Sequence, residues 1–253
     1  MHIKKVLITG SSGYLGGFVV DRLAEQYELT LFDKVPPREQ HQKFRHIIGD
    51  IASFEDVWSA CEGQDAVVHL VALVRGREHD PLNKFVDVMI KGTWFIAEAC
   101  AKLGVKRLIN ISSICASGVI PKSEDKPYRV GEPCIVGGAD YYSLAKYLAE
   151  EAASAYAKDH DLSVIHLRPG VIDGDGANHS VTEPNNDCKL WFQYVDPRDI
   201  AQAIEAVLET NLKMGTYNIV AGREDSLYDW KSGAADFGYN PTHNWPQIPD
   251  RGK

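Results

Sequence analysis

The chain has 253 residues, which suits one large α/β domain or two small ones. A chain of this length buries most of its unfolded surface, so neither a disulfide nor a metal is needed to stabilise a core. The 27 basic and 35 acidic side chains give a formal net charge of −8, and no block of Lys or Arg stands out. This balance argues against a nucleic acid or an anionic membrane as a partner.

The cysteines and the N-terminus indicate a cytoplasmic protein. The five cysteines are widely spaced and never form a Cys-x-x-Cys pair, so we interpret them as reduced thiols. The N-terminus lacks the apolar segment of a signal peptide, and no apolar run approaches the ~20 residues of a membrane span. The nine histidines show no ligand spacing, so no metal site is predicted.

Strands and helices are predicted in alternation along the chain. The expected strands are 5–9, 28–33, 44–48, 66–70, 107–111, 163–167 and 216–220, and the expected helices are 14–26, 54–61, 81–103, 142–158 and 199–209. Ser53 is expected to cap the second helix, and Asp80 with Pro81 at the first helical position to start the third. Alternation of this kind predicts an α/β fold with a Rossmann-type, doubly wound parallel sheet.

We treat residues 1–253 as a single domain with two parts. The predicted core, residues 1–169 and 196–220, contains the alternating strands and helices. Residues 170–195 and 221–253 look irregular and do not fit the alternation. We assign them to a small C-terminal lobe that caps the carboxyl ends of the strands, where sheets of this kind bind ligands.

A glycine-rich turn connects the first strand to the first helix. Its glycines allow a tight turn, close approach of a phosphate and close helix contact, and the free N–H groups of the helix then face a pyrophosphate. An ordinary glycine-rich turn is the alternative, but strand, loop and helix fall in register and favour a dinucleotide. The expected contacts are Gly10, Ser12, Gly13, Tyr14, Leu15 and Gly16.

The ends of the second and third strands carry acids. Asp33 stands where a carboxylate accepts hydrogen bonds from the adenosine ribose. It would repel a 2′-phosphate, so NAD is favoured over NADP, although the neighbouring Lys34 weakens this preference. A solvated turn acid is the alternative. Asp50 and Ile51 are expected to contact the edge of the adenine. The equal alternative is that this is simply a polar stretch that leads into a helix.

Tyr142 and Lys146 are four residues apart in a predicted helix, so their side chains share a face. A phenol ionises near pH ~10, and a nearby ammonium favours the phenolate. The pair predicts an acid/base unit for a hydroxyl proton, unless the spacing is chance. Ser112 and Ser113 follow the fifth strand, where a hydroxyl would face the cofactor cleft, although such serines are also common in turns.

Taken in this order, these motifs resemble the extended short-chain dehydrogenase/reductase family, which includes NAD-dependent sugar epimerases, dehydratases and dehydrogenases. Stretches 67–72, 167–170 and 194–201 match its later blocks, so the resemblance covers nearly the whole chain. It implies that Ser113, Tyr142 and Lys146 are catalytic, and that Tyr142 and Lys146 also contact NAD. It further places Leu70, Val71, Ala72, Pro169 and Val171 on the nicotinamide side of the cofactor.

The C-terminal half is most similar to uronate dehydrogenases, through stretches 182–186, 204–207 and 226–241. This resemblance implies an NAD-dependent oxidation of a free sugar or sugar acid at C1, with a lactone as product. A nucleotide-sugar epimerase, dehydratase or reductase with a reduced C-terminal lobe is the alternative. A non-catalytic NAD(H)-binding regulator is a third reading, against which the intact Ser, Tyr and Lys set argues.

The chain departs from the family pattern near the expected substrate. Met89 replaces an Asn, so a hydrogen bond near the site is expected to be lost or replaced. Where uronate dehydrogenases carry an Arg for the sugar carboxylate, Lys189 supplies charge without a bidentate fork. Arg75 and Arg77 are alternative partners for the sugar carboxylate, unless they are simply solvated charges in a loop. The expected substrate contacts are Arg75, Ser112, Ile114, Asn185 and Lys189.

The family resemblance also implies a homodimer. Its members commonly associate through the helix after Asp80 and the helix of Tyr142. The small residues of the Tyr142 helix would permit close helix packing, although a helix face buried within one subunit would look the same. These residues are Ala145, Ala149, Ala152 and Ala153.

Overall fold

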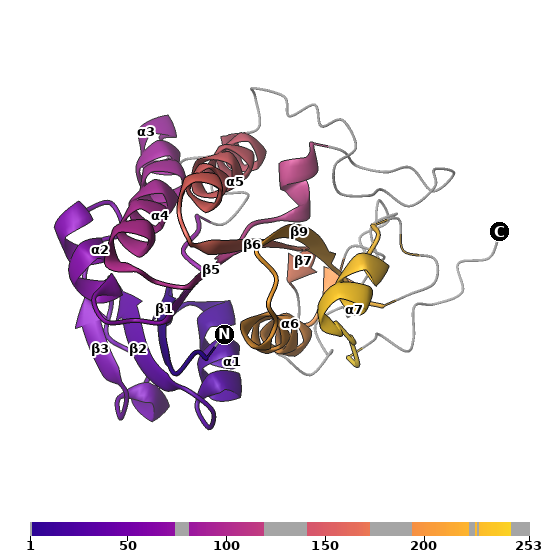
Figure 1. The fold of residues 1–253 in the computed structure, drawn as a ribbon, viewed down its shortest axis with the longest axis horizontal. Coiled ribbons are helices and arrows are strands. Elements are labelled where there is room, and N and C mark those ends of the chain that lie inside the picture. Colours follow the sequence, from indigo (N-terminus) through magenta and orange to yellow (C-terminus); the bar gives the residue numbers. More distant parts are fainter. Residues whose placement is uncertain are drawn as a thin grey trace.

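A computed structural model describes residues 2–73, 81–118, 141–172, 194–222, 226 and 228–243. Within these residues, seven strands form one sheet in the order β3-β2-β1-β4-β5-β6-β9 (Figure 1). Every neighbouring pair in this sheet is parallel. The predicted α/β fold with a doubly wound parallel sheet is therefore confirmed.

The strands coincide with the apolar runs of the sequence. They are β1 (Lys5–Thr9), β2 (Glu28–Asp33), β3 (Arg45–Ile48), β4 (Ala66–His69), β5 (Arg107–Ile111), β6 (Ser163–Pro169) and β9 (Met214–Ile219). Each end lies within two residues of its prediction. A separate parallel pair, β7 (Val171–Ile172) and β8 (Tyr194–Val195), was not expected.

The main helices also follow their predicted segments. They are α1 (Tyr14–Leu23), α2 (Phe54–Cys61), α4 (Gly92–Leu103), α5 (Tyr141–Asp159) and α6 (Pro197–Glu209). Short 3-10 turns, η1 (Glu39–His41) and η3 (Ile114–Ser117), complete the connections. The Ser53 hydroxyl accepts the Asp56 N–H and caps α2, as predicted.

Two details of the helix prediction are wrong. The third helix is not uniform, because α3 (Leu82–Phe85) continues through the π-helical segment η2 (Val86–Lys91) into α4, and Pro81 is its N-cap rather than its first residue. The stretch after residue 220 is not wholly irregular, because α7 (Lys231–Phe237) forms there. This helix is short and contains a glycine, so its sequence pattern is weak.

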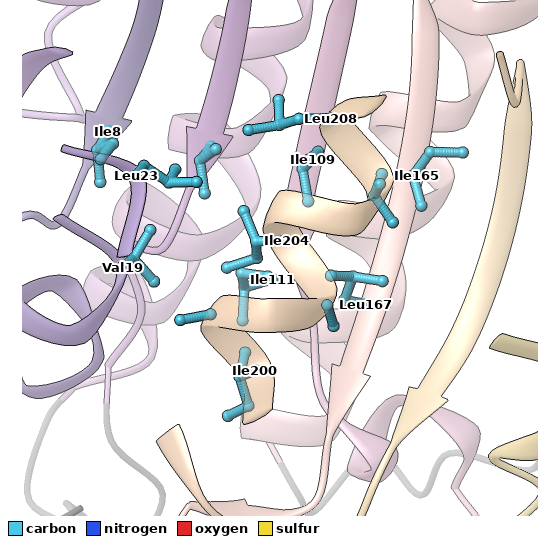
Figure 2. Packing of buried hydrophobic residues seen from close by; sticks show 14 of the residues in the cluster. Ile8, Val19, Leu23, Ile109, Ile111, Ile165, Leu167, Ile200, Ile204 and Leu208 are labelled. Carbon is cyan, nitrogen blue, oxygen red and sulfur yellow. The ribbon is translucent and has the colours of Figure 1, made fainter. Parts of the chain in front are cut away.

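Helices cover both faces of the sheet (Figure 1). Alternate residues of β1 point to opposite sides, so Val6 and Ile8 join the core under α1 and α6 while Leu7 joins the core under α2 and α4. Figure 2 shows Ile200 and Ile204 of α6 facing the sheet, packed among residues such as Ile109 of β5. Each such fully buried side chain stabilises the fold by roughly 1.5–3 kcal/mol.

The sheet topology brings distant segments to one edge. Because the strands are parallel, the residues that follow β1, β2, β4, β5 and β6 all leave at the same edge. The chain crosses to one face after β1 and to the other after β4, and these strands are neighbours. Such a switch point opens a crevice at the carboxyl ends, where α/β sheets bind their ligands.

The C-terminal lobe is described only in part. Helix α7 lies against β9, and the Tyr217 hydroxyl of β9 donates to Asp236 at 2.8 Å. Residues 173–193 lie outside the described residues, so the division into core and lobe stays a prediction. Among the described helices, none has the length and apolar character needed to cross a membrane.

Candidate active site

The turn after β1 is built so that only glycine fits at key positions. Gly10 has a φ of 74°, and a Cβ there would also lie 3.0 Å from the Val71 backbone nitrogen. A Cβ on Gly16 would collide with the backbone oxygens of Gly10 and Ser11. The first turn of α1 has no acidic residue, and its N-cap Gly13 has no side chain. The N-terminus of α1 therefore carries no competing carboxylate and no side-chain cap, which fits the pyrophosphate of a dinucleotide.

The predicted adenosine residues lie beside this turn. The Ser12 N–H donates to Asp33 at 3.0 Å, which fixes the carboxylate at the loop. Lys34 pairs with Asp50 at 2.9 Å, so its charge is already compensated. Burial alone raises the pKa of Asp50, but the Ala52 N–H and Lys34 outweigh it and the pKa is lowered. The side chain of Ile51 is buried in the core, so its backbone is the part of this residue that could contact an adenine.

The residues predicted for the nicotinamide side leave two other strand ends. The Leu70 N–H donates to Thr9 at 3.1 Å, and Val71 packs against Gly10, so the end of β4 lies next to the glycine turn. Ala72 is exposed. At the end of β6, Pro169 is buried and Val171 is exposed. These positions fit a cofactor that crosses from β1 toward β6.

Lys146 lies at the carboxyl end of β5. Its side chain is buried, and its Nζ donates to the Ile111 carbonyl at 2.7 Å. Because Ile111 ends β5 and the two serines follow directly, this contact brings Lys146 to the serine turn. Burial lowers the pKa of Lys146 to about 8, against opposing contributions from Glu150 and Cys115.

Tyr142 lies one turn before Lys146 on α5. Its ring is half-buried and packs on the cluster of Leu73, Phe85, Met89 and Ala145. The neighbouring Tyr141 is 45% exposed, with its ring edge on Phe85. The helix thus turns Tyr142 inward, on the same side as Lys146, and turns Tyr141 outward.

The two serines are both buried at the strand end. The Ser113 hydroxyl accepts the Cys115 N–H at 3.2 Å and caps η3. The Ser112 hydroxyl has no hydrogen bond of good geometry among the described residues, yet it lies close enough to Glu150 to stabilise that carboxylate. Ile114, an expected substrate contact, packs with Val220. The structure therefore brings Ser112, Ser113 and Lys146 together.

Comparison with known proteins identifies the family. Residues 6–220 match the NAD dependent epimerase/dehydratase family. The chain belongs to this family. It is accordingly an NAD-dependent oxidoreductase of the short-chain dehydrogenase/epimerase type, and the expected resemblance is confirmed.

Three relatives span nearly the whole chain. Uronate dehydrogenase from Pseudomonas putida is 29% identical over 245 residues, which cover 94% of this chain and 83% of that protein. NAD-dependent glucose-6-phosphate dehydrogenase from Haloferax volcanii is 24% identical over 264 aligned positions, covering 98% and 97%. The crystal structure of uronate dehydrogenase from Agrobacterium tumefaciens has a TM-score of 0.80 at 24% identity, covering 96% and 85%.

Met89, where the family resemblance led us to expect an Asn, packs in an apolar cluster. Its side chain is buried beside Phe85, and its backbone carbonyl accepts the Thr93 hydroxyl at 2.7 Å. Thr93 in turn accepts from His69 Nε2 at 3.1 Å, so His69 Nδ1 accepts from Thr9 at 2.7 Å. Burial and the charge of Lys146 lower the pKa of His69 to about 3, so this histidine is neutral.

Sequence reasoning missed several polar residues around the site. Glu150 and Arg168 form a buried bidentate ion pair beneath Lys146, and only the four-residue spacing from Lys146 to Glu150 could have indicated it. Arg38 donates to the Gly13 carbonyl at 2.8 Å from the loop after β2. His69 had no predicted role, although it falls in a block that matches the family.

Several predicted substrate contacts cannot be placed. Arg75, Arg77, Asn185 and Lys189 lie outside the described residues. The substrate side of the site therefore stays a prediction, whereas the residues proposed for the cofactor and the proton transfer all have described positions.

Proposed function

We propose that this family member oxidises the C1 hydroxyl of a free sugar or sugar acid to a lactone, with NAD as the acceptor. The observation that carries the proposal is the position of Lys146, bonded to the last carbonyl of β5 beside Ser113 and one turn from Tyr142. Similarity to a uronate and a sugar-phosphate dehydrogenase over most of their lengths supports a sugar substrate.

The chain's own residues supply the proton chemistry in this proposal. Ser113 donates a hydrogen bond to the substrate oxygen and holds the hydroxyl at Tyr142. Tyr142 as phenolate takes the hydroxyl proton, and the ammonium of Lys146 favours that phenolate. The glycine turn, Asp33 and the ends of β4 and β6 would hold NAD, which supplies the hydride acceptor when bound. Lys146 has further N–H donors for the nicotinamide ribose.

A sugar labelled with deuterium at C1 tests the reaction directly. We expect the deuterium to move to the nicotinamide of the product cofactor, one label for each lactone formed, because the bond to C1 is broken. Label that stays in the sugar while the enzyme retains its NAD would contradict a C1 dehydrogenase. That result would instead favour a nucleotide-sugar epimerase or dehydratase.

Asp33 should set the preference for NAD over NADP. Replacing Asp33 by Ser removes the carboxylate that would repel a 2′-phosphate, so the ratio of kcat/KM for NADP to that for NAD should rise about tenfold, which corresponds to about 1.4 kcal/mol. Steady-state kinetics with both cofactors measures this ratio. The control Glu39→Gln removes an exposed acid on η1 and should leave the ratio unchanged. An unchanged ratio in Asp33→Ser would show that Asp33 does not contact the ribose.

We further propose a homodimer formed through α4 and α5. Tyr141 and Leu148 are seven residues apart on α5, and both are exposed, as are Leu82 and Trp94 on the neighbouring helices. Large apolar side chains gathered on adjacent helices are typical of an interface. Leu148→Glu should therefore convert a dimer to a monomer in light scattering at micromolar concentration. An exposed control on another face, Met214→Glu, should stay dimeric, and a monomeric wild-type chain would contradict the proposal.

A cytoplasmic location is part of the same proposal. Cys61 and Cys100 are buried as free thiols between α2 and α4. Thiols stay reduced in the cytosol, where disulfides are rare. Fractionation of cells that express the chain would test this location.

A further inference from the structure

Glu150 continues the stripe of functional side chains along α5. Tyr142, Lys146 and Glu150 follow one another at intervals of four residues, so the three side chains lie on one helix face. Lys146 is 5% exposed and Glu150 is 4% exposed. Opposite charges one helical turn apart attract each other when little water separates them.

Arg168 of β6 fixes the Glu150 carboxylate in place. Its Nε and one terminal nitrogen donate to the two carboxylate oxygens at 2.8 Å and 2.6 Å. Such a bidentate pair determines both the position and the orientation of the carboxylate. Burial alone raises the pKa of Glu150, but Arg168 outweighs it and the pKa lies below its ordinary value. Glu150 is therefore an oriented anion beneath Lys146.

The other groups around this pair leave Glu150 as the main counter-charge. His69 of β4 is neutral, because burial and the charge of Lys146 lower its pKa to about 3. It therefore adds no charge beside Lys146. His166 of β6 accepts from Asn110 and donates to Ser154, and burial lowers its pKa to about 4. Cys115 of η3 raises the pKa of Lys146 less than Glu150 does. Among the described residues on this face of α5, Tyr142 is the remaining titratable group.

We propose that Glu150, held by Arg168, is a positioning residue that keeps Lys146 in its ammonium form beside Tyr142. The inference rests on the proposed role of Lys146 in the proton transfer. Burial of Lys146 favours the neutral amine, and a fixed anion one turn away opposes that effect. Without Glu150, Lys146 would lose its proton at lower pH, and the neutral amine would no longer favour the Tyr142 phenolate.

The inference predicts a change in the titration of Lys146 itself. In Glu150→Gln, its pKa should fall below the value of about 8 in the wild-type chain, by about one unit, a tenfold change in the acid dissociation constant. NMR of protein with isotope-labelled lysine measures this titration, and the signal is identified by its loss in Lys146→Arg. The measurement needs neither sugar nor NAD.

A matched control separates this role from the general structural effect of a buried acid–arginine pair. Glu205 on α6 is also buried and also pairs with an arginine, Arg22, but it lies on the other face of the sheet. Glu205→Gln should leave the Lys146 titration unchanged. A lowered pKa in Glu150→Gln together with an unchanged one in Glu205→Gln supports the proposal.

A second variant keeps the test decisive if Glu150→Gln does not fold. Glu150→Gln with Arg168→Gln removes both charges, so no unpaired arginine stays buried. Its Lys146 pKa should also fall, because the Glu150 carboxylate that raises this pKa is gone. An unchanged pKa in either folded variant would overturn the inference. Absence of sugar oxidation would instead count against the proposed function and leave this titration unaffected.

Discussion

Replacing Tyr142 by Phe should lower kcat for sugar oxidation by about 10²–10⁴-fold, the usual contribution of a positioned acid/base. The substitution removes only the hydroxyl, and the ring still packs on Phe85 and Met89. The affinity for NAD should stay close to that of the wild type, because the glycine turn and Lys146 are unchanged. Steady-state kinetics and a fluorescence titration with NADH measure the two quantities.

The adjacent tyrosine provides the matched control for this prediction. Tyr141 is exposed and turned away from Lys146, so Tyr141→Phe should keep nearly the wild-type rate. The same loss in both variants would point to a general disturbance of α5. Near wild-type turnover in Tyr142→Phe would remove Tyr142 from the mechanism.

Replacing Arg107 by Met should lower the free energy of unfolding by at least about 3 kcal/mol, because several buried carbonyls lose their donor. The Arg107 guanidinium is fully buried. It donates to the backbone carbonyls of Val207 and Leu208 at the end of α6, to that of Leu212 in the following connection, and to the Ser163 hydroxyl. Urea unfolding followed by circular dichroism measures the change.

An exposed lysine provides the control for how much of this loss of stability depends on burial of the cation. Lys213 pairs with Asp161, but both side chains are exposed. Lys213→Met should therefore change stability little, since exposed ion pairs contribute weakly. If Arg107→Met were as stable as Lys213→Met, the carbonyls at the end of α6 would not depend on the guanidinium for their hydrogen bonds.

The fold was predictable because local patterns determine most of it. Continuous apolar runs indicated buried parallel strands, and the positions where those runs end gave the strand ends. Helix α7 escaped prediction because seven residues with a glycine carry little periodicity. The π-helical segment before α4 was missed because apolar periodicity does not distinguish a π-helical turn from an α-helical one.

The predicted site residues come together for a related reason. Gly10, Val71 and Ser113 follow strands and Asp33 ends one, and the carboxyl ends of parallel strands lie at one edge of the sheet. The residues that were missed act through long-range pairs: Arg168 meets Glu150 from another element, and His69 meets Thr9 across sixty residues. A single sequence does not show which polar side chains will meet in the interior.

NADH formation with free uronates, free aldoses and nucleotide-sugars, assayed side by side, tests the central claim most directly. The proposed function predicts net NADH formation with a free uronate or aldose and none with the nucleotide-sugars. Product formation from a nucleotide-sugar alone, with no net change in NADH, would contradict it and establish the chain as an epimerase or dehydratase of the same family.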